Sequence, residues 1–170
     1  MIIDSVPNSI SDPILTLLES DQVPWVFGNE GVKELDTAGY YDSPQFTHTM
    51  IEEDYAGDVH PAVHDLWKYV YKAHKEVAED FVKLYRIKCN MVTRGKDSVP
   101  HVPHLDRYTP HTVMIYYVND CDGNTIIFNG EEEVRITPEK GKYVIFSGDL
   151  KHCGTSPIVS NYRLLINFNF

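Results

Sequence analysis

Apolar side chains recur at helical spacing in one long stretch of the chain, from Pro61 to about Phe81. Acidic residues and lysines fill the positions between them, so one face is apolar and the other polar. The apolar positions of this stretch are Val63, Leu66, Trp67, Val70, Val77 and Phe81. The pattern predicts one long amphipathic helix.

A shorter helix is expected near the amino terminus. Asp12 is followed by Pro13, which is typical of an N-cap residue and a proline at the first helical position. Apolar residues then continue to Leu18. Residues 22 to 58 are irregular and rich in Gly, Pro and Asp, apart from one alternating strand expected around Phe46 to Ile51.

Beyond the long helix the period of the pattern changes from helical to two. Tyr85, Ile87, Cys89 and Met91 alternate with Arg86, Lys88 and Asn90, as in a half-buried strand. Turn sequences separate further short strands, expected at Thr112 to Val118, Thr125 to Phe128, Val134 to Ile136, Lys142 to Phe146 and Tyr162 to Phe170. Many short strands at regular intervals predict a mainly β fold such as a jelly roll, preceded by supporting helices.

Length and composition fit this picture. The chain has 170 residues, of which 42% are apolar, so it can form one sizeable core. We therefore expect a single domain over residues 1–170, with residues 1–84 as a helical and irregular support region and residues 85–170 as the jelly-roll core that carries the site.

The charge and the cysteines limit partners and compartment. The formal net charge is -10, which would repel phosphate backbones, so non-specific nucleic-acid binding is not expected. No apolar run approaches membrane-spanning length, and the first residues lack a basic segment followed by an apolar one. Three widely spaced cysteines fit reduced thiols better than a disulfide framework. We expect a protein of the cytoplasm with no membrane contact.

A possible metal site lies at His104-Leu105-Asp106, after a proline-rich approach that favours extended backbone. Residues two apart in an extended chain point to the same side, so His104 and Asp106 can both face one metal ion. His152, just after the turn Ser147-Gly148-Asp149, can return as a third ligand. Two histidines and one carboxylate with open positions opposite are typical of non-haem Fe(II) oxygenases. His101 is a neighbouring residue that can contact substrate or orient a ligand.

A late strand adds a fourth polar residue. It starts at Arg163 and alternates, with Leu164, Ile166, Phe168 and Phe170 on one face and Arg163, Leu165, Asn167 and Asn169 on the other. The second face is either solvated or lines a polar ligand cavity, and alternation alone does not decide between these interpretations.

In this order, these residues resemble the prolyl-4-hydroxylase-like branch of the Fe(II)/2-oxoglutarate oxygenases. That branch has His-x-Asp, a distal His, and a basic residue about ten positions later, here His104, Asp106, His152 and Arg163. Residues 115–120 are similar to its tyrosine-bearing strand, and residues 122–128 to its Gly-Gly-x-Thr-x-x-Phe segment, with Asp122 at the first glycine position. The resemblance covers roughly residues 85 to 170.

The resemblance implies a double-stranded β-helix, or jelly roll, and a specific chemistry. His104, Asp106 and His152 would be the catalytic iron ligands, and Arg163 with Tyr117 would bind the distal carboxylate of 2-oxoglutarate. The reaction would consume dioxygen and couple oxidative decarboxylation of 2-oxoglutarate to succinate with hydroxylation of a peptide or small-molecule substrate, with peptidyl proline or a related group as the first expectation.

Two other classes stay open on the sequence alone. A cupin-like metal-dependent isomerase or sugar-binding jelly-roll domain would keep the metal, but Arg163 would then be incidental. A non-catalytic β-sandwich interaction module would place His104, Asp106 and His152 far apart.

Overall fold

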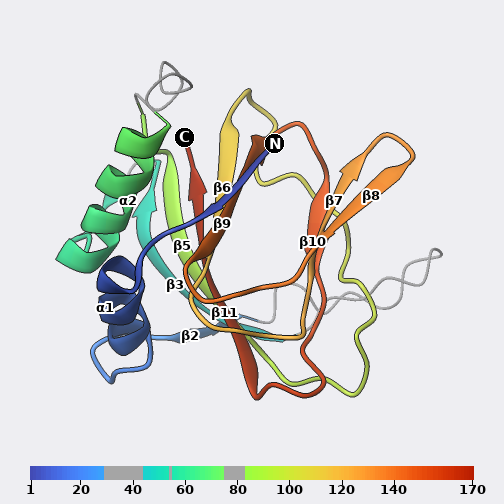
Figure 1. The fold of residues 1–170 in the computed structure, drawn as a ribbon, viewed down its shortest axis with the longest axis horizontal. Helices are drawn as coiled ribbons and strands as arrows, with labels where there is room; N and C mark the ends of the chain where they lie inside the picture. The colour runs from blue at the N-terminus through green and yellow to red at the C-terminus, as the bar shows by residue number, and fades with distance from the viewer. Residues whose placement is uncertain (29–43, 54, 75–82) are drawn as a thin grey trace.

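The structure is a computed structural model that describes residues 1–28, 44–53, 55–74 and 83–170 (Figure 1). The larger of two sheets has the order β1-β9-β6-β11-β5-β3-β2, with β4 paired to β3. Its strands are β1 (Ile2–Ser5), β2 (Val26–Gly28), β3 (Gln45–Glu52), β4 (Tyr55–Ala56), β5 (Arg86–Thr93), β6 (Thr112–Tyr117), β9 (Lys142–Ser147) and β11 (Tyr162–Asn169). All the pairings in this sheet are antiparallel.

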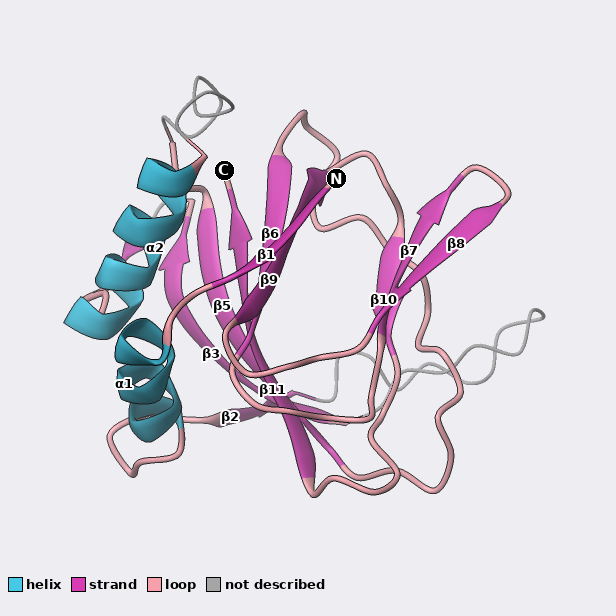
Figure 2. Ribbon diagram, in the orientation of Figure 1, coloured by secondary structure: helices cyan, strands magenta, loops and turns pink. Residues whose placement is uncertain are grey.

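The smaller sheet faces the larger one on the side away from the helices (Figure 2). Its order is β10-β7-β8, with β7 (Thr125–Asn129), β8 (Glu132–Ile136) and β10 (His152–Gly154). An isolated antiparallel bridge between His104 and His152 adds the segment at His104 to the edge of this sheet. Two facing antiparallel sheets with this connectivity confirm the predicted jelly roll.

The two helices of the described ranges cover the outer face of the larger sheet (Figure 1). They are α1 (Asn8–Leu18) and α2 (Pro61–Ala73). As predicted, α2 begins at Pro61, and the His60 ring accepts a hydrogen bond from the Ala62 backbone N–H at 3.2 Å. The predicted continuation to about Phe81 includes Val77 and Phe81, which lie outside the described residues.

The predicted start of the first helix was wrong. α1 begins at Asn8 with Pro7 as its N-cap residue, so Pro13 lies inside the helix. The helix starts a turn earlier because Ile10 already packs against the core, at the spacing that Ile14 and Leu18 continue. Asp12 is no cap, and its carboxylate instead pairs with Lys140 at 2.7 Å.

The other predicted strands are present with bounds shifted by a few residues, whereas β1, β2, β4 and β10 were not predicted. β1 has a single partner, β9, and three of its four residues are exposed, so it lacks an alternating pattern. β10 is only three residues long, and its pairing with β7 holds it in the smaller sheet. Strands of this kind depend on long-range pairing and leave little local signal.

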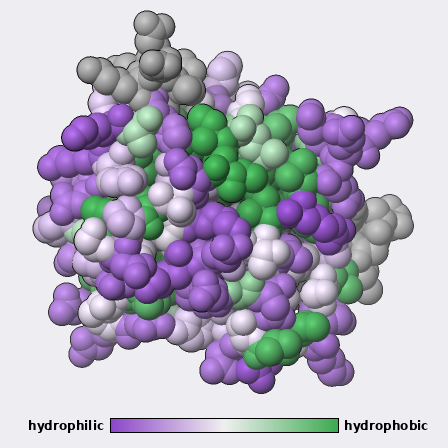
Figure 3. All heavy atoms as spheres, in the orientation of Figure 1, coloured by the Kyte–Doolittle hydropathy of each residue, from purple (hydrophilic) through white to green (hydrophobic). Residues whose placement is uncertain are grey.

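The apolar side chains form two clusters on the two faces of the larger sheet. The first lies between this sheet and the helices and includes Leu18, Leu66 and Phe168. The second lies between the two sheets and includes Ile127 and Leu165. The surface drawn in Figure 3 is largely hydrophilic, with apolar atoms gathered toward its upper centre. No helix in the described ranges has the length and apolarity needed to cross a bilayer.

Candidate metal centre

The two histidines of the predicted triad, His104 and His152, pair through their backbones. The N–H of His104 donates to the carbonyl of His152, and the N–H of His152 donates to the carbonyl of His104, both at 3.0 Å. Directly paired residues of an antiparallel pair project their side chains to the same side. The two imidazole rings consequently lie side by side, with centroids 4.9 Å apart.

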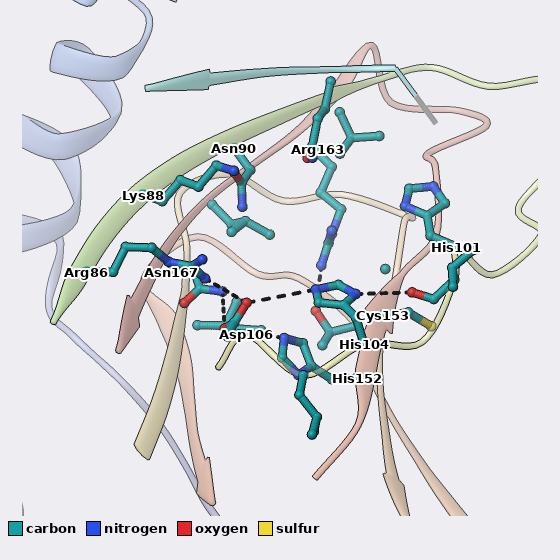
Figure 4. A pocket seen from close by; sticks show the side chains of 18 residues that line it. Arg86, Lys88, Asn90, His101, His104, Asp106, His152, Cys153, Arg163 and Asn167 are labelled. Carbon is teal, nitrogen blue, oxygen red and sulfur yellow. Dashed lines mark hydrogen bonds and ion pairs between the residues drawn. The ribbon is translucent and has the colours of Figure 1, made fainter. Parts of the chain in front are cut away.

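Asp106 completes the group from the same segment as His104. The nearest carboxylate oxygens of Asp106 lie 3.9 Å from Nε2 of His104 and 3.7 Å from Nε2 of His152. One ligand atom from each of the three residues lies within 4.8 Å of the others, and they converge on one point (Figure 4). The structure therefore brings together the residues that the sequence singled out, against the interaction-module alternative.

Backbone carbonyls orient both rings. Nδ1 of His104 lies 3.1 Å from the carbonyl oxygen of Val102, and Nδ1 of His152 lies 3.4 Å from that of Leu150. A carbonyl can only accept, so Nδ1 is the donor in each ring and Nε2 keeps its lone pair. In both rings the nitrogen that faces Asp106 is thus the one that can bind a metal.

Three donors hold the Asp106 carboxylate. The side-chain amides of Asn167 and Asn169 each donate to Oδ2 at 2.9 Å, and Arg86 pairs with Oδ1 at 2.6 Å. Burial by itself would raise the pKa of Asp106, but the charge interactions with His152 and Arg86 and the two amide donors outweigh it and hold the pKa well below its usual range. Asp106 is therefore an anion at any physiological pH.

Burial also keeps the inner histidine neutral. Desolvation of the imidazolium lowers the pKa of His152 to about 4, although the neighbouring Asp106 opposes this shift. A neutral imidazole is the form that binds a metal ion. At neutral pH His152 thus presents a neutral imidazole nitrogen beside the Asp106 carboxylate.

The triad opens into a cavity of about 400 Å³ between the two sheets. Side chains from β5 and β11 form one wall of it, and residues of β7, β10 and the segment at His104 form the opposite side (Figure 4). Its polar and charged lining residues are Gln45, Arg86, Lys88, Asn90, His101, His104, Asp106, Thr125, His152, Arg163 and Asn167. This volume lies within the range of small-molecule sites.

Arg163 reaches into this cavity from β11 (Figure 4). Its side chain is only 4% exposed, and one guanidinium nitrogen donates to the hydroxyl of Thr125 at 2.5 Å. No carboxylate among the described residues pairs with it, and its Nε–H is buried without an acceptor. Desolvation lowers the pKa of Arg163, but a guanidinium stays protonated. A buried cation without an anion is costly unless a ligand supplies one.

Gly154 makes room for this guanidinium. A Cβ atom at Gly154 would lie 2.6 Å from Nη1 of Arg163, closer than any real contact. Gly154 lies two residues beyond His152, so one short strand provides both a triad histidine and the space for the arginine.

Tyr117 was expected to bind the distal carboxylate of 2-oxoglutarate together with Arg163, but it lies below the surface of the cavity. It is fully buried in the cluster between the sheets and is not among the residues that line the cavity. Burial raises the pKa of its phenol, against a smaller opposing effect of Arg163. Its contact with a ligand stays a prediction.

Asp122, at the first glycine position of the family's segment, has a structural role. Its carboxylate accepts hydrogen bonds from the backbone N–H groups of Ile158, Val159 and Ser160 at 2.8, 3.0 and 2.8 Å. The carboxylate therefore fixes the loop that leads into β11 and Arg163.

Sequence reasoning did not assign a role to the residues around Asp106. Arg86, Lys88 and Asn90 were recognised only as the polar face of a strand, Thr125 was recognised only as part of a motif segment, and Gly154 was not singled out. The alternation along β5 was visible in the sequence. Which of the two faces of β5 points into the cavity is fixed by the pairing of β5 with β11. In that pairing Arg86 is opposite Asn169, and Lys88 is opposite Asn167.

Comparisons with known proteins agree with the fold. No protein-family model matches the chain, and no curated protein sequence matches it significantly. Among solved structures, a prolyl-4-hydroxylase from Pseudomonas putida is similar with a TM-score of 0.65 and 13% identity, over 99% of this chain and 90% of that one. A 2OG-Fe(II) oxygenase family protein from Burkholderia pseudomallei gives a TM-score of 0.68 at 11% identity, over 98% and 84% of the two chains.

A third similar structure contains bound ligands. HygX from Streptomyces hygroscopicus, with nickel and 2-oxoglutarate bound, gives a TM-score of 0.65 at 13% identity, over 99% of this chain and 81% of that one. At such identities the likeness concerns the fold. The chain has the fold of prolyl-4-hydroxylases and other 2-oxoglutarate and Fe(II) oxygenases, as the resemblance in sequence predicted.

Proposed function

We propose that this protein is an Fe(II)- and 2-oxoglutarate-dependent oxygenase. His104, Asp106 and His152 would hold the metal, and Arg163 would bind the distal carboxylate of 2-oxoglutarate. The observation that carries the proposal is the buried guanidinium of Arg163, which has no carboxylate partner in the described residues and lines the same cavity as the triad. A metal site alone has no need of such a cation.

The triad fits Fe(II). Two neutral imidazoles and one carboxylate are the donors of the facial site that leaves coordination positions open for other ligands. Here the three ligand atoms come from one edge of the smaller sheet, and the cavity lies in front of them. When bound, Fe(II) and 2-oxoglutarate supply the oxidising chemistry, in which the oxo acid loses carbon dioxide to become succinate and the substrate gains oxygen.

The protein's own residues hold and orient these groups. Arg86, Asn167 and Asn169 keep Asp106 ionised and fix its rotation, and the carbonyls behind the two histidines fix the rings. A guanidinium can bind a carboxylate through two parallel hydrogen bonds, which fixes both the position and the direction of the ligand. Tyr117 is proposed as a further donor to that carboxylate.

The reaction class is proposed as hydroxylation. Peptidyl proline is favoured by the resemblance, and one structure of the same fold is a prolyl hydroxylase in complex with a hypoxia inducible factor peptide from Trichoplax adhaerens. Structures of the same fold also include HygX with hygromycin B bound and the epimerase SnoN from nogalamycin biosynthesis. Among such proteins the fold alone does not select the substrate.

The test is an anaerobic titration of the protein with Fe(II) and then with 2-oxoglutarate. We expect one Fe(II) per chain and a weak visible charge-transfer band that forms only when both are present. His104→Ala should lose the metal and the band. Arg135→Met, a change on the exposed strand β8, is the matched control and should keep both.

The two alternatives predict different results. A cupin-like isomerase or sugar-binding domain would bind the metal but show no saturable response to 2-oxoglutarate. A protein without a metal site would show neither, and either result would contradict the proposal.

A further inference from the structure

We infer that Arg86 stabilises the ferrous state over the ferric state of the iron that the triad would hold. It is a positioning residue that acts through Asp106, and its positive charge opposes a further positive charge on the metal. This inference rests on the metal part of the proposed function, because it requires iron at this site. It assigns a role to a charge that the orientation of the ligands does not explain.

Arg86 approaches Asp106 from the side away from the two histidines (Figure 4). Its Nη2 lies 2.6 Å from Oδ1 of Asp106, and the two side chains are only 17% and 5% exposed. Salt and solvent screen such a partly buried pair much less than a pair at the surface. The guanidinium is therefore a strong fixed charge, and only the carboxylate group separates it from a metal ion bound by Asp106.

The other oxygen of this carboxylate has neutral donors. The side-chain amides of Asn167 and Asn169 both donate to Oδ2 of Asp106 at 2.9 Å. Two such hydrogen bonds from one face of β11 are enough to fix the rotation of the carboxylate. Arg86 contributes to the same orientation, but it also brings a positive charge that repels a metal ion. Because neutral donors can provide the orientation, the position of a cation beside a metal ligand points to a role of the charge itself.

The repulsion between Arg86 and the metal depends on the oxidation state of the iron. Imidazoles bind a metal in their neutral form, so the triad carries one negative charge, that of Asp106, and Arg86 offsets it. The ferric ion has one more positive charge than the ferrous ion and is repelled more strongly. The hydrogen bond that orients Asp106 serves both ions alike. The charge of Arg86 should consequently raise the reduction potential of the couple in which bound Fe(III) takes up one electron to become Fe(II).

Other cations also lie near the site. Arg107, which follows Asp106 in the chain, pairs with Glu53 at 2.7 Å, so its charge is offset. Lys88 and Arg163 line the same cavity as Arg86. Both are unchanged in every variant of the test, so a difference in reduction potential between variants of Arg86 reports the charge of Arg86 alone.

The experiment measures the reduction potential of the full chain loaded with iron, without 2-oxoglutarate. The protein is equilibrated with redox mediators at a series of potentials, and Fe(III) is quantified by electron paramagnetic resonance. Arg86→Gln keeps a hydrogen-bond donor but removes the charge, whereas Arg86→Lys keeps the charge. We expect Arg86→Gln to raise the affinity for Fe(III) relative to Fe(II) at least about tenfold, which lowers the potential by at least about 59 mV. Arg86→Lys should keep this ratio of affinities within about threefold of the wild-type value.

Asn167→Ala is the matched control for orientation. It removes a neutral donor from the same carboxylate and leaves every formal charge in place. A loss of orientation affects the binding of both oxidation states, so the ratio of their affinities should change less than about threefold in this variant.

The outcomes separate this inference from the proposed function. A wild-type protein that binds no iron contradicts both. A protein that binds iron but does not respond to 2-oxoglutarate contradicts the proposed function alone, because the potential is measured without the co-substrate. A shift below tenfold in Arg86→Gln, or an equal shift in Arg86→Lys or Asn167→Ala, contradicts the role of the charge. Loss of iron binding by both Arg86 variants would make Arg86 a structural requirement of the site and would also overturn the inference.

Discussion

Replacing Arg163 with methionine tests the role of the buried guanidinium through two effects of opposite sign. Methionine keeps an unbranched side chain of similar reach but removes the charge. If Arg163 binds a ligand carboxylate, the variant should lose 2-oxoglutarate affinity and yet gain stability when no ligand is present. A purely structural arginine would behave differently, because its loss would destabilise the fold.

The magnitudes follow from the surroundings of the guanidinium. Hydrogen bonds to charged groups contribute about 1.5–3 kcal/mol each, so a bidentate pair of roughly 3–4 kcal/mol corresponds to an increase of about 10²–10³-fold in the Kd for 2-oxoglutarate. In the unliganded protein, Arg163 is 4% exposed, and its guanidinium donates a 2.5 Å hydrogen bond to the hydroxyl of Thr125. Removal of a buried cation without a counter-ion should raise the free energy of unfolding by about 1–3 kcal/mol after the loss of that bond.

Two assays measure these effects. Calorimetric titration of 2-oxoglutarate into the anaerobic Fe(II) protein gives the Kd, and urea unfolding of the metal-free protein gives the stability. Arg135→Met on the exposed strand β8 is the control, and its stability should change by less than about 0.5 kcal/mol. A wild-type Kd in Arg163→Met, or destabilisation of the metal-free protein by about 2 kcal/mol or more, would contradict the proposed role of Arg163.

Other substitutions test single steps of the account. Gly154→Ala places a Cβ atom 2.6 Å from Nη1 of Arg163, so it should raise the Kd for 2-oxoglutarate at least about tenfold in the same titration, and unchanged affinity would show that the guanidinium can move aside. Asp122→Ala removes the acceptor of three backbone N–H groups, so urea unfolding should show a loss of about 1–2 kcal/mol, whereas a loss near zero would mean that water replaces the carboxylate. Burial, together with the charges of Arg163 and His104, lowers the pKa of His101 from 6.5 to about 4. As the pH falls, His101 is therefore protonated in the unfolded chain before it is protonated in the folded protein. The free energy of unfolding should consequently fall as the pH drops from about 6.5 to about 4. In urea unfolding at these two pH values, His101→Gln should reduce the fall by about 1–2 kcal/mol. An equal fall in the variant and the wild-type protein would contradict this prediction.

The sequence predicted the parts of the site that depend on local geometry. His104 and Asp106 are two residues apart in extended backbone, so their shared direction follows from the strand period. The alternation after Arg163 likewise placed Asn167 and Asn169 on one face. The open choice between a solvated face and a polar cavity is settled by the amide donors to Asp106.

The remaining parts depend on contacts between distant segments. The ion pair of Arg86 with Asp106 requires β5 to lie beside β11, and no local pattern contains that pairing. Pro13 misled the prediction of α1, because a proline inside a helix and a proline at its start look alike when the preceding residue is a good N-cap. Tyr117 was chosen for its place in a motif, whereas its depth below the cavity is set by the packing between the sheets.

The most direct measurement of the central claim is succinate formation from 2-oxoglutarate. The protein with Fe(II) and dioxygen should convert 2-oxoglutarate to succinate and carbon dioxide, slowly without a substrate and faster with one, and chelation of the metal or exclusion of dioxygen should stop it. Asp106→Ala, which removes the charged ligand from between the two histidines, should show no conversion. Succinate formation that persists in Asp106→Ala, or its absence in an iron-loaded wild-type protein, would contradict the assignment of this site.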